Sequence, residues 1–298
     1  MSLASPFADL DRARGALSRA AGAFVTTVHT GRHSVGGIAW RDDLLVAPAE
    51  RLTRALDVRV HGSAGEAAGQ VIALDLATDV GIVRCARVWE REATSAPAVP
   101  EVGESVALVG REEGELAVDW RAIRKVGAPW RSRRGATIDL RIEIDSASAE
   151  ALEGSALVTG DAGVVGMLVY GPQRRLLAIP SVTIERVVAE LAIHGRLRHG
   201  YLGVSLVPLP LSPEVAARWQ VGRGSALVVA DVRAGSPAAI AGLEVGDCLT
   251  AADGAALEGV GTLTRLIRER GPGAVVRLAR RRGGALEELA VTLGERPR

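Results

Sequence analysis

Hydrolytic chemistry in this sequence could rest on one serine or on a group of carboxylates. Ser155 lies in a strand-like stretch and would need a histidine within hydrogen-bond reach to act as a nucleophile. Asp79, Glu153 and Glu50 could converge in one cleft, where carboxylates serve as acid–base pairs or metal ligands. Nothing in their spacing selects a substrate or a metal. Five histidines are possible bases, and two of them (His33 and His61) are expected in loops: His29, His33, His61, His194 and His199.

Composition excludes several other kinds of function. The two cysteines, Cys85 and Cys248, stand in separate apolar stretches without metal-ligand spacing. We therefore expect two buried thiols, no metal site and no cofactor. The net charge of +1 gives no field that would attract nucleic acid or anionic lipid. The longest apolar run, 163–170, is far shorter than the ~18 residues of a membrane span.

The start of the sequence bears on the compartment. Asp9 and Asp11 come before any apolar stretch, and Arg14 and Arg19 interrupt the apolar residues after them. A secretory signal needs a basic start and an unbroken apolar core, so none is expected here. This favours a cytoplasmic protein, unless a signal has already been removed.

Helical spacing marks two segments, and the chain is long enough for two domains. The first lies within 6–24, where Phe7, Leu10, Leu17 and Ala21 recur at helical intervals, and the second covers 181–193. Between them, short apolar runs separated by Gly, Asp and Pro indicate an all-β barrel or sandwich. These runs are 24–28, 36–40, 44–47, 58–60, 70–74, 81–85, 105–109, 138–144 and 164–170.

A second pattern begins after the basic stretch 195–200. Residues 201–204 (Tyr-Leu-Gly-Val) open a strand, and 233–243 (Arg-Ala-Gly-Ser-Pro-Ala-Ala-Ile-Ala-Gly-Leu) predict a turn, a short helix and its glycine stop. A helix at 262–270 ends at Gly-Pro-Gly, and strands are expected at 275–280 and 287–293. The combination of the first two stretches at this distance resembles a bacterial-type PDZ domain.

This resemblance implies a groove for a peptide carboxyl terminus. In PDZ domains a loop of backbone N–H groups binds the terminal carboxylate, and the strand after it pairs with the peptide. Gly203 lets the backbone approach the ligand because it has no Cβ. Arg198 or His199 could add positive charge beside the carboxylate. The apolar residues of the groove would also be needed for the core of a domain used only for intramolecular docking, so this alternative stays open. The implied peptide-binding residues are Tyr201, Leu202, Gly203, Val204, Leu263 and Leu266.

Three stretches of the first module also match a known pattern. They are 75–84 (Asp-Leu-Ala-Thr-Asp-Val-Gly-Ile-Val-Arg), 142–158 with 163–166, and 177–181 (Leu-Ala-Ile-Pro-Ser). Together with the PDZ pattern, they resemble the HtrA/Deg family of trypsin-like serine proteases. The resemblance implies a mainly β fold, a trypsin-like double six-stranded β-barrel followed by an α/β PDZ domain. The implied boundaries are a helical segment at 1–23, the barrel domain at 24–194, a linker at 195–200 and the PDZ domain at 201–295.

A serine protease combines a serine, a histidine base and an aspartate that orients the imidazole. The family's aspartate falls on Asp79, while its Thr-Asn-x-His segment falls on 46–49, or one residue later, which places Ala49 or Glu50 at the histidine. Its Gly-Asn-Ser-Gly-Gly-Pro-Leu-Val falls on 151–158, which places Glu153 at the serine. Ser155 is displaced by two residues, or roughly 6–7 Å along an extended chain. The triad is therefore degenerate at two positions.

These degenerate positions predict an HtrA-like pseudoprotease that binds peptide or protein C-termini as an adaptor, a chaperone or a regulatory subunit. The alternatives are an endopeptidase that uses Ser155 and a hydrolase that uses Asp79 with Glu153. The family also forms trimers through N-terminal aromatic residues, for which Phe7 and Phe24 are the candidates here. A homo-oligomer and association with an active relative both remain open, and family members are mostly periplasmic.

Overall fold

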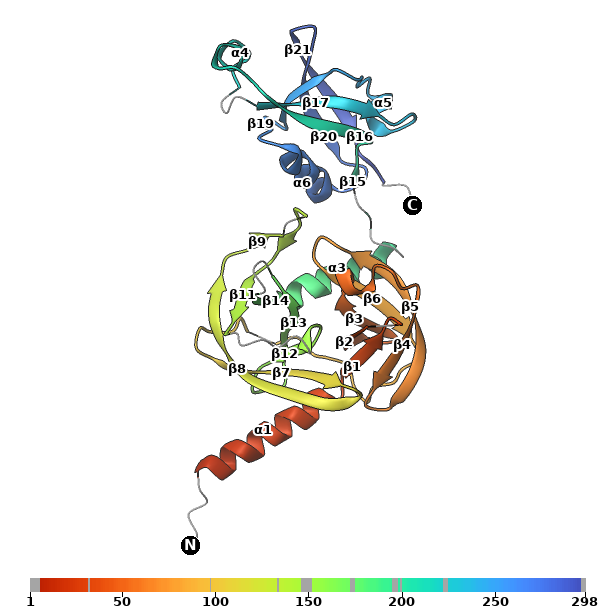
Figure 1. Ribbon diagram of the computed structural model, residues 1–298, viewed down its shortest axis with the longest axis vertical. Coiled ribbons are helices and arrows are strands. Elements are labelled where there is room, and N and C mark those ends of the chain that lie inside the picture. The colour runs from red at the N-terminus through yellow and green to blue at the C-terminus, as the bar shows by residue number, and fades with distance from the viewer. Residues whose placement is uncertain are drawn as a thin grey trace. The chain divides into compact units, whose positions relative to one another are not determined.

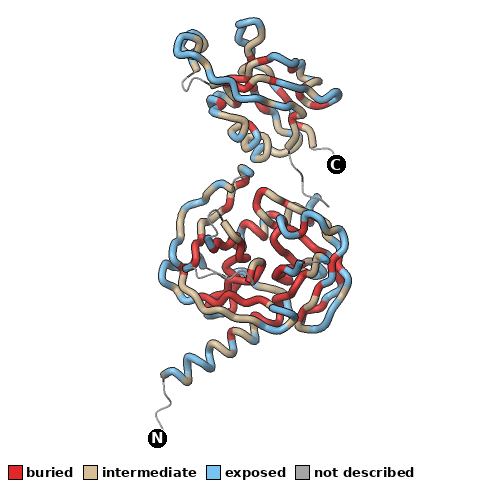
Figure 2. Tube along the Cα trace, in the orientation of Figure 1, coloured by how far each residue is buried: buried red, intermediate tan, exposed pale blue. Residues whose placement is uncertain are grey.

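The computed structural model describes residues 6–31, 33–96, 98–132, 134–145, 152–171, 175–194, 198, 200–221 and 225–295. The chain forms two compact units, and the second takes in everything from residue 198 onward. Figure 1 shows two barrels in the first unit and a sheet with helices in the second. Buried residues fill the interior of each unit (Figure 2).

The first barrel is closed by six of the described strands, in the order β1-β2-β3-β6-β5-β4. Strand β1 pairs antiparallel with both β2 and β4, which closes the ring. Its interior is apolar, and Phe24, Ile38, Leu45 and Ile82 have no exposed surface. The elements are β1 (Val25–His29), β2 (Ser34–Arg41), β3 (Leu44–Pro48), α2 (Ala49–Leu52), β4 (Asp57–Gly62), β5 (Gly65–Asp75) and β6 (Val80–Cys85).

The second barrel has six described strands in the order β11-β14-β13-β12-β7-β8. Helix α3 (Ser181–His194) comes after it and buries Ile184, Val187 and Val188, as its 3.6-residue spacing predicts. A two-stranded ladder of β9 (Trp130–Arg131) and β10 (Thr137–Ile138) lies between β8 and β11 in the chain. The barrel strands are β7 (Ser105–Glu112), β8 (Glu115–Gly127), β11 (Arg141–Ile144), β12 (Ala156–Val158), β13 (Val164–Tyr170) and β14 (Leu176–Pro180).

The single strand expected at 138–144 was wrong, because the chain breaks there into β10 and β11. Asp139, which lies in the break, is held by helix α3. Its N–H donates to Thr183 Oγ1 at 3.1 Å, and its carboxylate accepts from Thr183 Oγ1 at 2.7 Å and Arg186 Nη2 at 3.0 Å. These contacts to the helix replace the ladder bonds that a continuous strand would have made.

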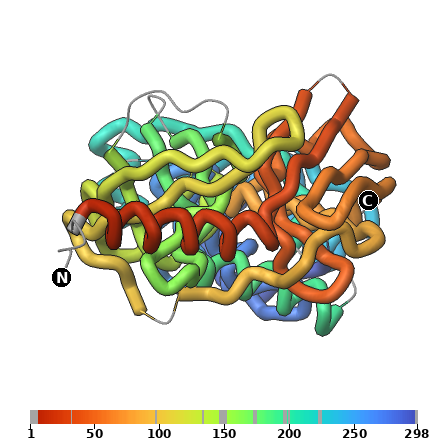
Figure 3. Tube along the Cα trace, turned by 90° about the horizontal axis from the view of Figure 1, so that it is seen from below, coloured from red at the N-terminus to blue at the C-terminus, as the bar shows by residue number. Residues whose placement is uncertain are grey.

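Helix α1 (Pro6–Gly22) precedes the first barrel and is only half covered. Leu17 and Ala21 are buried, whereas Phe7 and Leu10 are 75% and 46% exposed. Figure 3 views the double barrel from the side on which α1 lies, next to β7 and β8. The apolar spacing of the sequence therefore continues beyond the part of the helix that packs.

The second unit is a sheet with the main strand order β16-β17-β18-β20-β21, in which β16 and β21 are the edge strands. Leu227, Leu249, Leu263 and Val276 belong to its core. With the two barrels, this unit confirms the predicted fold class. Its elements are β15 (Gly200–Tyr201), β16 (Val204–Pro210), α4 (Pro213–Trp219), β17 (Ser225–Val232), α5 (Pro237–Ile240), β18 (Cys248–Ala252), β19 (Ala255–Ala256), α6 (Val260–Arg270), β20 (Val275–Arg282), β21 (Ala285–Thr292) and β22 (Gly294–Glu295).

Candidate functional site

Asp79 lies in the turn between β5 and β6 and holds the start of helix α2. Its Oδ1 accepts a hydrogen bond from the N–H of Glu50 at 2.9 Å, and its carbonyl accepts from the N–H of Ala49 at 3.2 Å. Its φ of 60° is left-handed, which aspartate tolerates better than most residues. The hydrogen bonds that Asp79 accepts thus come from backbone groups of α2 rather than from an imidazole.

The pKa of Asp79 is raised to about 7. Burial is the main cause, because it disfavours the charged form. The N–H groups of Glu50 and Ala49 oppose the shift, while the nearby carboxylates of Glu50 and Glu153 add to it. Asp79 is therefore a carboxyl group that changes its charge near neutral pH.

The two possible histidine positions differ in their surroundings. Ala49 is fully buried, so its side chain does not face solvent. Glu50 is exposed, and its N–H is the group bonded to the Asp79 side chain. A catalytic base in a cleft must face solvent. The alignment that places Glu50 at the histidine position satisfies this condition, whereas the alignment that places Ala49 there does not. Neither residue supplies an imidazole.

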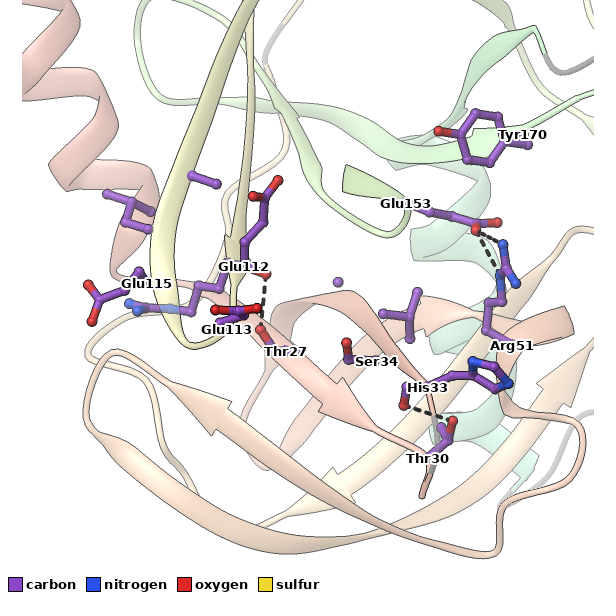
Figure 4. Close-up of a pocket in the computed structure, with 15 residues that line it drawn as sticks. Thr27, Thr30, His33, Ser34, Arg51, Glu112, Glu113, Glu115, Glu153 and Tyr170 are labelled. Atoms are coloured by element: carbon purple, nitrogen blue, oxygen red, sulfur yellow. Dashed lines mark hydrogen bonds and ion pairs between the residues drawn. The ribbon is translucent and has the colours of Figure 1, made fainter. Parts of the chain in front are cut away.

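Glu153 is engaged by an arginine. Arg51 Nε donates to Glu153 Oε2 at 2.7 Å, and Arg51 Nη2 donates to the same oxygen. The Glu153 side chain is only 12% exposed, whereas that of Arg51 is 54% exposed. The hydrogen bond to Glu153 raises the pKa of Arg51. Figure 4 shows the two side chains facing each other beside Tyr170.

The backbone around Glu153 is fixed as closely as its side chain. The carbonyl of Glu153 accepts a hydrogen bond from the N–H of Gly36 at 2.8 Å. Gly154 has a φ of +85°, and a Cβ at this position would lie 2.2 Å from the Gly36 carbonyl oxygen. Only glycine fits this close approach between the two barrels. The residues just before, 146–151, lie outside the described part of the chain.

Ser155 faces the interior of the second barrel. Ser155 is 1% exposed, and its N–H donates to the carbonyl of Leu152 at 3.0 Å. The hydroxyl group lies over Gly110 of β7, where a Cβ would come within 2.2 Å of Oγ. The hydroxyl group is thus packed against a strand and not directed into a cleft.

The predicted histidines lie in separate places. His33 lines the cleft between the two barrels, and its carbonyl accepts from Thr30 N at 2.8 Å. His29 belongs to β1, His61 to β4 and His194 to the last turn of α3. His199 lies outside the described residues.

This cleft between the two barrels has a volume of about 1070 Å³. Arg51, Glu153 and Tyr170 line one part of it. The tip of the β7–β8 hairpin lines another and carries three carboxylates, so the cleft is polar and acidic at that end (Figure 4). The hairpin carboxylates are Glu112, Glu113 and Glu115. The sequence did not point to these three carboxylates, because they belong to no motif.

Arg111 sets the position of this hairpin. Its guanidinium donates to three backbone carbonyls, those of Gly22 at 3.0 Å, Val25 at 3.0 Å and Gly114 at 2.9 Å. Burial lowers the pKa of Arg111, and the carboxylate of Glu115 opposes that effect. The arginine therefore fixes the base of the first barrel to the hairpin of the second.

The loop before β16 is shaped by Gly203. This glycine has a φ of +85°, and a Cβ would lie 2.2 Å from Ser236 Cβ. The Gly203 carbonyl accepts from Arg233 N at 2.9 Å, and the Leu202 carbonyl accepts from Ala238 N at 2.9 Å. Both carbonyls thus turn toward the segment around α5.

Apolar side chains lie beside this loop. Leu202 and Leu263 are buried at 3% and 1% exposure, while Val204 and Leu266 are partly buried against the same core. Tyr201 belongs to β15 and pairs with Gly294. The structure therefore gathers the predicted peptide-binding residues at one end of β16 and along α6. Of the two residues predicted to place positive charge beside the peptide carboxylate, Arg198 is among the residues that the structure describes and His199 is not.

No group of His, Cys, Asp and Glu that could hold a metal occurs among the described residues. The helices of the described part of the chain include none that is long and apolar enough to cross a membrane.

Comparison with known proteins gives three kinds of similarity. A family model of the PDZ domain matches residues 200–293. A probable periplasmic serine endoprotease, DegP-like, from Chlamydia muridarum is 33% identical over 143 residues, 48% of this chain and 27% of that protein. Its namesake from Brucella suis is 28% identical over 202 residues, 66% of this chain and 39% of that protein. The chain thus spans between about a quarter and two fifths of the length of these curated relatives.

Solved structures resemble the whole chain. The serine endoprotease from Yersinia pestis has a TM-score of 0.69 at 20% identity, covering 95% of this chain and 98% of that one. The HtrA-type protease AlgW with a decapeptide has a TM-score of 0.69 at 21% identity, covering 96% and 99%. The fold and the sequence similarity define a trypsin-like double β-barrel protein with a PDZ domain. Within that class, the chain is similar in sequence to DegP-like serine endoproteases over part of its length.

Proposed function

We propose that this chain is a non-proteolytic HtrA-type protein that binds the C-termini of peptides or proteins through its PDZ domain. It would act as an adaptor, a chaperone or a regulatory subunit, as a homo-oligomer or beside an active relative. The observation that carries the proposal is the ion pair between Arg51 and Glu153, the residue that the family resemblance aligns with the serine nucleophile. A carboxylate held by a guanidinium is a poor nucleophile, because its charge is already neutralised.

The geometry of Ser155 argues against its use as a substitute nucleophile. Its hydroxyl group packs against β7 inside the second barrel, and the residue is 1% exposed. A nucleophile must come within about 3–3.5 Å of the substrate carbonyl, with a base in hydrogen-bond reach. Ser155 would have to leave its strand to meet these conditions.

A carboxylate mechanism has one observation in its favour, the pKa of about 7 for Asp79. A general acid or base works best when its pKa lies near the working pH. Its partner in such a mechanism would be Glu153, which Arg51 holds in an ion pair. Asp79 and Glu153 therefore do not supply two free carboxylates. A protease assay distinguishes this mechanism from the proposal.

We expect no turnover of an unfolded substrate by the full chain. The measurement is release of fluorescence from labelled casein, with the Ser155→Ala and Glu153→Ala variants run beside the parent chain. All three should match the buffer blank. Turnover that is lost only in Ser155→Ala would establish the serine mechanism, whereas loss only in Glu153→Ala would establish the carboxylate mechanism. Either result would overturn the non-proteolytic proposal.

Peptide binding is supported by the loop at Gly203 and by the open edge of β16. We expect the full chain to bind peptides that end in an apolar residue with a free carboxylate, and to lose binding when that carboxylate is amidated. Leu266→Ala should weaken binding by about tenfold, because it removes apolar contact with the last side chain. Fluorescence anisotropy with a labelled peptide measures both effects.

The matched control is Leu286→Ala on β21, where the leucine is 57% exposed. This variant should bind as the parent chain does. Binding that ignores the terminal carboxylate, or equal losses in the two leucine variants, would contradict a PDZ-type groove.

A further inference from the structure

Helix α2 connects Asp79 of the first barrel to Glu153 of the second. At its start, Asp79 Oδ1 accepts a hydrogen bond from the N–H of Glu50 at 2.9 Å. Pro48, the residue before the helix, makes no side-chain capping bond, so Asp79 takes over this role from another turn. One residue after Glu50, Arg51 donates to Glu153. The helix has four residues, so the capping carboxyl group and the ion pair lie within about one turn of each other.

Three carboxyl groups and one guanidinium interact around this helix. After burial, the charges of Glu50 and Glu153 are further causes that disfavour the ionised form of Asp79. The hydrogen bond to Glu153 is the main cause that raises the pKa of Arg51, and the charge of Asp79 adds to it. Asp79 and Glu153 therefore share one cation, and each is affected by the charge of the other.

Three further titratable groups lie near this site. Asp75 belongs to the same turn as Asp79 and accepts a hydrogen bond from Thr78 Oγ1 at 2.9 Å. Tyr170 lies beside Glu153 (Figure 4), and burial, followed by the charge of Glu153, raises the pKa of its hydroxyl group. His33 lines the same cleft, and histidine side chains commonly titrate near neutral pH. A test of Asp79 must therefore separate its effect from that of His33.

The two charge states of Asp79 act differently on the ion pair. A neutral Asp79 still accepts the bond from the N–H of Glu50, so the start of α2 is held in both states. An ionised Asp79 attracts Arg51 and repels Glu153, and both forces oppose the pair. The Glu153 side chain is only 12% exposed, so these forces act through a medium of lower dielectric constant than bulk water. The coupling is reciprocal: because the charge of Glu153 raises the pKa of Asp79, ionisation of Asp79 destabilises the charged Glu153.

We propose that Asp79 and helix α2 form a charge switch that controls the Arg51–Glu153 pair in the cleft. The pair is closed while Asp79 is neutral and loosens when Asp79 is ionised. The barrels keep their places, because the Glu153 carbonyl still accepts from the N–H of Gly36 and Arg111 still holds the β7–β8 hairpin. What changes is the charge that the cleft presents, from a closed ion pair to a partly released carboxylate and guanidinium. A charged ligand would therefore bind the cleft with different affinities in the two states.

The test follows two arginine Nε–H groups of the full chain by NMR, from about pH 6 to about pH 8, on either side of the Asp79 pKa of about 7. Arg51 Nε–H donates to Glu153 and Arg111 Nε–H donates to the carbonyl of Val25, so exchange with water is slowed at both. Hydroxide accelerates both exchange rates alike, and their ratio cancels this effect. We expect the ratio of the Arg51 rate to the Arg111 rate to rise about threefold or more over this range. A ratio that stays constant would overturn the proposal.

Two variants assign the effect to its source. Asp79→Asn cannot ionise but keeps a side-chain oxygen for the N–H of Glu50, so its ratio should stay at the low-pH value of the parent chain. His33→Gln is the matched control in the same cleft and should keep the full rise. A rise that persists in Asp79→Asn, or one that disappears in His33→Gln, would overturn the proposal.

A second arm uses the reciprocal effect and does not depend on the Asp79 variant. In Glu153→Gln, the NMR signal of the Asp79 carboxyl carbon should titrate at a pH lower than in the parent chain by about half a unit or more, because a repelling charge has been removed. Glu185→Gln is the control, since that carboxylate pairs with a different arginine, Arg41. Equal midpoints in Glu153→Gln and the parent chain would show that Asp79 and the ion pair are not coupled, and the proposal would fail.

Discussion

Replacing Asp79 by asparagine is expected to raise the melting temperature of the barrel unit at pH 8 by roughly 5–12 °C. The pKa of Asp79 in the folded protein is about 7, well above its ordinary value of 3.8. Between these values the folded state binds more protons than the unfolded state, so the free energy of unfolding falls as pH rises from about 4 to 7. The loss amounts to about 2–4 kcal/mol.

Asparagine removes this cost without disturbing the turn. Its side-chain oxygen can still accept the hydrogen bond from Glu50 N–H, and asparagine tolerates a left-handed φ. The difference in unfolding free energy between variant and parent should therefore be small near pH 4 and reach its full size near pH 8. Denaturant titration at several pH values measures this difference.

The control is Asp43→Asn, because that carboxylate is 52% exposed and forms a surface ion pair with Arg84. Its effect on the free energy of unfolding should be below about 1 kcal/mol at pH 5 and at pH 8. If the Asp79 variant gains the same stability at both values, the pH dependence of the barrel does not come from Asp79.

Replacing Asp247 by alanine is expected to destabilise the PDZ unit by about 3–5 kcal/mol. The Asp247 side chain is 1% exposed. Burial alone would raise its pKa, but the Arg282 guanidinium holds that pKa below the ordinary value. Arg282 Nε donates to Oδ1 at 2.7 Å, and the N–H of Glu244 donates to Oδ2 at 2.9 Å. Alanine leaves these donors, and the nearly buried Arg280, without the carboxylate.

Hydrogen exchange followed by mass spectrometry measures this effect within the full chain, because it reports on the two units separately. Protection should fall in β18 and β20 of the PDZ unit and stay unchanged in both barrels. Glu288→Ala is the matched control, since its ion pair with Arg277 is exposed on both sides and should be worth less than about 1 kcal/mol. An Asp247→Ala variant as stable as this control would show that the buried network adds little.

Much of the fold could be predicted from local patterns, and the misses have physical causes. Most core strands carry short apolar runs, and these runs indicated the barrels correctly. Strand β8 (Glu115–Gly127) was missed, because it has few buried residues and many polar ones. It is stabilised instead by pairing with β7 along the whole of that strand's length, a contact between segments that no local pattern records.

The sequence indicated the residues of the candidate site, and only the structure shows their contacts. The sequence alone indicated Asp79 and Glu153, but it did not decide whether Ala49 or Glu50 takes the histidine position. Burial of Ala49 and the bond from Glu50 to Asp79 distinguish the two positions only in three dimensions. No local sequence pattern indicated Arg51, because its contact is with Glu153, 102 residues away in the chain.

The three hydrogen bonds of Arg111 have a mechanical consequence for the cleft. They join the segment that enters the first barrel, through Gly22 and Val25, to the hairpin of the second barrel, through Gly114. A hinge motion of one barrel against the other would have to break charge-assisted bonds between partly buried groups. The width of the cleft is therefore set before anything enters it. A ligand would be selected by its fit to a rigid opening, with little conformational entropy lost by the protein on binding.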